Sequence, residues 1–195
     1  MHRIGNHLVL FNLGWVASII FMAKGMPGMA LGCMALVLAS HLAVIAAPLK
    51  EAVFLACVAV FGTVIASAIS ASGLIGFTTV LADTGTVITW TIGLWMLFAA
   101  NINTGFNQIK RSWWTAAIGG TVLGALTYFA LAGLGMIESG FVTLAAFSVA
   151  WAIAMPILAL VADSIIDSAW LEPHSSDSTG TAASINGLAF DYMQR

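Results

Sequence analysis

The sequence contains very few charged residues. Of its 195 residues, 61% are hydrophobic and only 7% are charged, with 6 Lys and Arg against 8 Asp and Glu. A soluble domain carries about 25% charged residues because its surface faces water. A surface that faces lipid needs no such cover, so the composition excludes an ordinary soluble domain and indicates an integral membrane protein.

Basic clusters, cysteine pairs and catalytic motifs are also missing. The net charge of −2 and the lack of a basic stripe argue against a nucleic-acid partner. Cys33 and Cys57 stand singly in apolar runs, so we expect them to pack as small apolar side chains. There is no HExxH or GxSxG motif, and the acidic residues nearest the predicted spans, Glu51 and Asp163, lie at their edges. The residues therefore predict no catalytic site, no metal site and no cofactor.

Long apolar runs make up most of the chain. A helix needs about 20 apolar residues to cross a hydrocarbon core about 30 Å thick. Charged residues, glycines and prolines divide the runs into segments near this length, which predicts an all-α bundle of about six transmembrane helices. The predicted spans cover residues 7–23, 28–47, 52–82, 87–107, 115–136 and 142–161.

The third of these runs is too long for one upright helix. The Ser72-Gly73 pair predicts a break in it. For Leu74 to Ala82 three placements stay open: a spanning half-helix, a re-entrant segment, or a segment at the membrane interface.

Composition and charge predict two parts and an orientation. Residues 1–163 form the predicted transmembrane domain, and residues 164–195, rich in Ser, Thr, Gly and acidic residues, form a predicted disordered tail. One predicted side of the membrane carries five of the six Lys and Arg residues, so the positive-inside rule places both termini in the cytoplasm. The five are Arg3, Lys50, Lys110, Arg111 and Arg195.

Strong polar side chains gather in the predicted cytoplasmic half of three spans. Asn12 lies in the first span, His41 in the second, and Asn101 and Asn103 in the fourth. Polar groups buried in a bilayer are costly, so each needs a partner or a role. These four residues predict a polar site open to the cytoplasm or the inner leaflet. The alternative is interhelical hydrogen bonding, at about 0.6 kcal/mol per bond.

Small and hydroxyl side chains form further patterns. Gly28 and Gly32 form a GxxxG motif in the second span, and Gly120 and Gly124 continue a row of small residues in the fifth. Such rows let helices approach closely, so we expect both to pack within the bundle, with a homodimer seam as the alternative. One face of the third span carries the hydroxyl residues Thr63, Ser67 and Ser70.

The spacing of several Trp, Asn and Gly residues gives the chain a family resemblance. Its most distinctive part is Leu94-Trp95, Phe98-Ala99 and Asn103. The other matching positions are Asn12, Trp15, His41-Leu42, Glu51, Gly73-Leu74, Phe77, Gly120, Gly124, Tyr128 and Leu134-Gly135. Over roughly residues 12–135 the chain resembles bacterial inner-membrane proteins known only as a domain of unknown function. Members of that family are often encoded beside enzymes similar to cyclopropane-fatty-acyl-phospholipid synthase.

The resemblance implies a multi-pass protein of the bacterial inner membrane, with membrane lipids and lipid-modifying enzymes as its partners. The chain departs from the family pattern at Ala66, where the pattern has an aspartate, and at Thr104, where it often has a histidine. An accessory role in lipid modification or envelope stress is therefore the first expectation. The alternatives are a small transporter or flippase that uses the polar site, and a membrane enzyme or haem protein that uses His41, with His7 as the second haem ligand.

Overall fold

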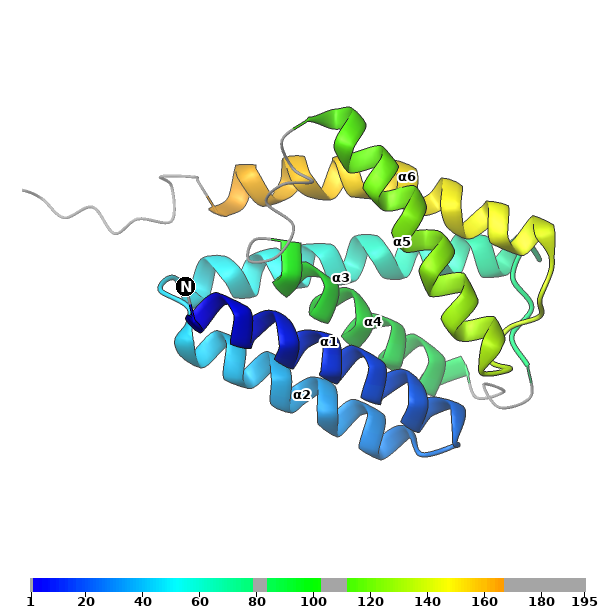
Figure 1. The fold of residues 1–195 in the computed structure, drawn as a ribbon, viewed down its shortest axis with the longest axis horizontal. Helices are drawn as coiled ribbons and strands as arrows, with labels where there is room; N and C mark the ends of the chain where they lie inside the picture. The colour runs from blue at the N-terminus through cyan, green and yellow to red at the C-terminus, as the bar shows by residue number, and fades with distance from the viewer. Residues whose placement is uncertain (1, 79–83, 103–111, 167–195) are drawn as a thin grey trace, which may run out of the picture.

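A computed structural model shows six α-helices and no β-strand in the residues that it describes. The described residues are 2–78, 84–102 and 112–166, with side chains from 9–78, 85–102 and 112–165. The helices are α1 (His2–Ala23), α2 (Pro27–Val44), α3 (Pro48–Ala71), α4 (Thr84–Ile102), α5 (Trp113–Gly133) and α6 (Phe141–Ile166) (Figure 1). The prediction of an all-α bundle is confirmed.

Proline and serine residues set several helix starts. Pro27 and Pro48 lie in the first turns of α2 and α3, where the missing N–H costs no helical hydrogen bond. At α5, the Thr115 N–H donates to Ser112 Oγ and the Ser112 N–H donates to Thr115 Oγ1, each at 3.1 Å. Because α3 begins at Pro48, ahead of its predicted start at residue 52, Glu51 lies in the first turn of the helix, where its side chain is buried.

The central helix of the bundle is α4. It packs against α3, α2 and α1, and its residues 97–100 are all buried. α5 crosses α6 obliquely to form a hairpin, and α6 joins the other helices through α3 (Figure 1). The start of α1, the α2–α3 turn and the end of α4 lie at one end of the bundle, whereas the α1–α2 and α5–α6 turns lie at the other.

The outside of the bundle is apolar. Leu36, Val60 and Phe141 are 71%, 67% and 84% exposed. Helices α2 to α6 are each long and apolar enough to cross a membrane, and α1 adds a shorter apolar stretch, Val9–Ala23. A surface of this kind suits lipid and not water, so the protein is a multi-pass membrane protein. The count of six spans and the cytoplasmic termini stay predictions.

The predicted break at Ser72-Gly73 is where α3 ends. Gly73 has a φ of 74°, which favours glycine because it has no Cβ. The chain then pairs with the α5–α6 turn: Phe77 forms an isolated antiparallel bridge with Ile137, and the Glu138 N–H donates to the Gly76 carbonyl at 2.8 Å. Residues 74–78 are therefore a loop fastened to the end of the bundle and not a half-span. Residues 79–82 lie outside the described residues.

The two glycine motifs have different surroundings. A Cβ at Gly120 would overlap the Trp151 carbonyl oxygen, and one at Gly124 would lie 2.6 Å from the Phe147 carbonyl oxygen, so α5 lies directly against the α6 backbone. By contrast, a Cβ at Gly28 or Gly32 would have no atom within 4 Å. The expected packing of Gly28 and Gly32 within the bundle is therefore wrong, because α2 turns that face outward.

The end of α6 does not coincide with the predicted domain boundary. The helix continues through Pro156 and is described as far as Ile166, past residue 163. Residues 167–195 of the predicted tail lie outside the described residues, so its predicted disorder stays a prediction.

Candidate functional site

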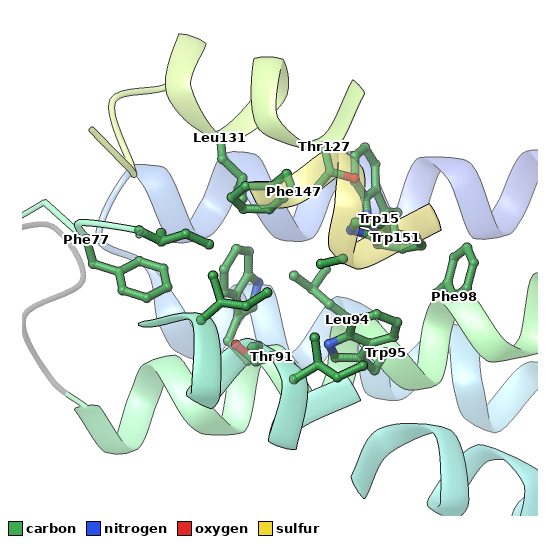
Figure 2. Close-up of a pocket in the computed structure, with 16 residues that line it drawn as sticks. Trp15, Phe77, Thr91, Leu94, Trp95, Phe98, Thr127, Leu131, Phe147 and Trp151 are labelled. Atoms are coloured by element: carbon green, nitrogen blue, oxygen red, sulfur yellow. The ribbon is translucent and has the colours of Figure 1, made fainter. Parts of the chain in front are cut away.

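An aromatic cavity of about 110 Å³ lies among α1, α3, α4, α5 and α6. Trp15, Trp95 and Trp151 reach it from three different helices, and Phe77 reaches it from the loop after α3 (Figure 2). Sixteen of the described residues line the cavity, and none of these sixteen carries a charge. The space therefore favours apolar groups, and the polar side-chain atoms of these residues belong to indole and hydroxyl groups.

Contacts between rings hold one wall of the cavity. Trp95 stacks on Trp151 with ring centroids 5.0 Å apart and an interplanar angle of 19°. Phe98 meets the same Trp151 ring edge-on, at 4.6 Å and 90°. Gly62 of α3 leaves room for the Trp95 indole, because a Cβ there would overlap the ring. These contacts brace the three rings against one another, and the rings form one wall of the space beside them.

Two hydrogen bonds connect the helices and the turn that surround the cavity. The Trp90 Nε1–H donates to Ser18 Oγ at 2.9 Å, and both side chains are buried. This bond joins α4 to α1. The Gly140 N–H donates to the Tyr128 hydroxyl at 2.9 Å and holds the α5–α6 turn. Because the Trp90 N–H is already paired, that indole contributes only its apolar surface to the cavity.

A cavity of this size and lining favours an apolar occupant over water. Water needs polar partners to enter a cavity, and an apolar cavity of about 150 Å³ in another protein stays dry and binds benzene. Ligand sites in proteins are mostly apolar clefts with a few polar groups that set orientation. The cavity therefore has the chemistry of a site for a hydrocarbon segment.

A second, more polar groove adjoins the cavity. It lies between α3 and α4, measures about 350 Å³, and is lined by Thr63, Ser67 and Ser70 of α3 and by Thr91 of α4. It is the hydroxyl face that the sequence pattern predicts in the third span, now placed opposite a neighbouring helix.

A buried polar pair lies at the other end of the bundle. His41 near the end of α2 and Glu51 in the first turn of α3 are 2% and 3% exposed, and His41 Nε2 lies 3.0 Å from Glu51 Oε1. With Glu51 as a carboxylate, Nε2 donates the hydrogen bond. The edge of the Phe11 ring meets the imidazole at 5.1 Å. The pair joins α2 to α3 in surroundings from which water is excluded.

Comparison with known proteins identifies the family. The model of the family DUF2878, described as a protein of unknown function, matches residues 5–157. The chain belongs to the DUF2878 family. Searches of curated proteins and of solved structures gave no match. Since this family has no assigned function, the function of this DUF2878 protein has to be argued from its site.

The three described members of the predicted polar site of this DUF2878 protein, Asn12, His41 and Asn101, do not line the cavity or the groove. His41 is buried against Glu51, whereas Asn12 is exposed on α1. Asn101 is 9% exposed, and its Oδ1 has no hydrogen-bond partner among the described residues. Asn103 lies outside the described residues. The sequence predicts His41 as a buried polar residue, whereas it does not predict the pairing with Glu51.

Sequence signals for the missed features exist in this DUF2878 protein. His41 and Glu51 flank a short turn, so they lie at the same depth on consecutive helices. Leu94, Trp95 and Phe98 follow a spacing that puts them on one helix face, the face that α4 turns toward the cavity.

The haem alternative for this DUF2878 protein depends on His7 and His41. The side chain of His7 lies outside the described residues, and the Nε2 of His41 is engaged by Glu51. Among the described side chains, no three His, Cys, Asp or Glu residues come together as a set that could hold a metal ion.

Proposed function

We propose that this protein is a membrane-embedded lipid-binding protein that holds a hydrocarbon segment of a membrane lipid in the aromatic cavity. The observation that carries the proposal is an uncharged, ring-lined space of about 110 Å³ inside a bundle whose outer surface suits lipid. A bilayer surrounds such a protein with acyl chains at high concentration, so an apolar site among its helices has an abundant ligand.

The arrangement supports binding better than chemistry. The buried His41–Glu51 pair is the only contact between a described histidine and a carboxylate, and its residues do not line the cavity. A general acid or base has to reach the reacting group through a hydrogen bond or a single water. No titratable side chain among the described residues lines the cavity in that way. The titratable pair is thus separate from the cavity, which favours an accessory role in which the protein binds a lipid without transforming it.

The family resemblance adds a setting to the proposal. Members are often encoded beside lipid-modifying enzymes, so we place the protein in the bacterial inner membrane as a partner of such an enzyme. In this setting it would bind a lipid chain and present the lipid to the enzyme, or withhold it.

Photo-crosslinking tests the proposal. The full chain is reconstituted in nanodiscs that contain a phospholipid with a diazirine near the middle of one acyl chain, and crosslinked peptides are identified by mass spectrometry. Wild-type protein should crosslink at cavity residues of α3 and α6. Ala150→Phe, which fills the cavity from α6, should remove these crosslinks.

The matched control is Ala68→Phe, which adds the same ring at an exposed alanine of α3 outside the cavity lining. This variant should keep the cavity crosslinks. Equal crosslinking by wild type and Ala150→Phe would overturn the proposal. If wild-type protein in liposomes instead moves labelled lipid between leaflets, the flippase alternative is the better description.

A further inference from the structure

Among the described residues, the groove between α3 and α4 contains Ser and Thr hydroxyls without a hydrogen-bond partner, whereas several other helical hydroxyls have one. Thr63, Ser67 and Ser70 lie one turn or two apart on one face of α3, and Thr91 faces them from α4. Within the described part of the chain none of these four hydroxyls makes a hydrogen bond, and Thr63 Oγ1 is buried without a partner. In a membrane an unpaired hydroxyl is costly, because no water competes to satisfy it.

Five other helical hydroxyls in the described residues are satisfied by their own helix. Each donates to the carbonyl four residues earlier, at 2.8 to 3.0 Å. These are Ser40, Thr89, Thr121, Thr127 and Ser164. The groove hydroxyls do not follow this pattern, so they are available to a group that enters the groove.

The groove and the aromatic cavity are neighbours with three lining residues in common. Ala66, Phe77 and Thr91 line both spaces. A single molecule with its chain in the cavity can therefore reach the hydroxyls with a polar group at the end of that chain. The two spaces match the two parts of an amphiphile.

The lining also limits the charge of that polar group. Among the described residues, none that lines the cavity or the groove is charged or is a histidine. A phosphate or carboxylate placed there would lose its hydration without gaining an ion pair, which is strongly unfavourable. A hydroxyl group can both donate to and accept from the Ser and Thr side chains, and an ester carbonyl can accept from them.

We propose that the ligand is a neutral, hydroxyl-bearing lipid of the acylglycerol class, with its hydroxyl head in the α3–α4 groove and its chain in the aromatic cavity. This inference rests on the proposed lipid-binding function and adds the class of the ligand. The protein should therefore discriminate between lipids that have the same acyl chain and different head groups.

Binding of two probes with one chain tests the inference. Delipidated full-length protein in detergent is titrated with 1-oleoylglycerol and, separately, with oleate, and bound lipid is counted by native mass spectrometry. Wild-type protein should bind 1-oleoylglycerol about tenfold or more tightly than oleate, as expected when one or two hydrogen bonds distinguish the heads.

A triple variant removes the groove hydroxyls with little change in volume. Thr63→Val, Ser67→Ala and Ser70→Ala together should reduce binding of 1-oleoylglycerol by about tenfold while oleate changes less. The matched control combines Ser40→Ala, Thr121→Val and Ser164→Ala, which remove hydroxyls that bond to their own helix. The control should bind as wild type does.

The outcomes separate this inference from the proposed function. Equal binding of the two probes by wild type, or equal binding of 1-oleoylglycerol by wild type and the triple variant, overturns the head-group assignment. If the acyl-chain crosslinks in the cavity are still present in that case, the lipid-binding function is retained. If the triple variant does not fold, the comparison of the two probes on wild-type protein decides alone.

Discussion

The two ends of the bundle differ in the side chains that they bury. At one end, His41 and Glu51 are buried together beside Phe11, with 2% and 3% of their side chains exposed. Toward the other, Trp95 and Trp151 stack on each other and leave a space of about 110 Å³ beside them. The first end encloses an ionisable pair, whereas the second encloses a space lined mainly by apolar side chains.

This difference indicates which end of the helix bundle can bind a ligand. A buried polar pair has to be closed in completely, because each group depends on the other for its hydrogen bond. Large rings braced against one another tolerate a space between helices, because their shape fixes the wall. We therefore expect substitutions at the His41 end to affect stability and those in the cavity to affect binding.

The largest effect on stability is expected from Glu51→Ala. The change leaves His41 buried without its partner, which should lower the free energy of unfolding by about 3 kcal/mol. Reversible unfolding in mixed detergent micelles measures it. Glu138→Ala removes an exposed glutamate and should change the value by less than about 0.5 kcal/mol. If His41→Leu with Glu51→Leu is as unstable as Glu51→Ala, the loss comes from packing and not from the broken pair.

An intermediate effect is expected where α5 supports the cavity wall. In Gly120→Ala the new methyl group overlaps the backbone of α6 at Trp151, which should cost about 2 kcal/mol. Gly32→Ala adds the same group where nothing lies within 4 Å, so it should be neutral or stabilise α2 by up to about 1 kcal/mol. The same unfolding measurement compares the two. A similar loss in Gly32→Ala would indicate that a second copy of the chain packs on α2.

The smallest effect is expected inside the cavity. Ala150→Leu adds three carbons to a side chain that faces the space, so the free energy of unfolding should change by less than about 1 kcal/mol. Ala154→Leu, one turn further along α6, adds the same atoms at a side chain with 0% exposure and should cost about 1–3 kcal/mol. Equal losses in the two variants would mean that the cavity is not open to a larger side chain.

The sequence by itself determined the class of protein and the approximate extent of its helices. Hydropathy is a property of consecutive residues, so apolar runs identified the helices, and Pro27, Pro48 and the Ser72-Gly73 pair marked their ends. The hydroxyl face of Thr63, Ser67 and Ser70 was also predictable, because one helix alone places residues on a face.

Only the tertiary structure decided which faces meet. Gly28-Gly32 and Gly120-Gly124 are alike as motifs, yet one faces outward and the other lies against α6. From the sequence, Glu51 lies at the edge of a predicted span. Only the structure shows that α3 begins at Pro48 and that the Glu51 side chain is buried against His41. The cavity is lined by five helices, from residues far apart in the chain. The rotation of each helix about its axis results from packing against several neighbours at once, and a linear pattern of apolar residues does not contain that information.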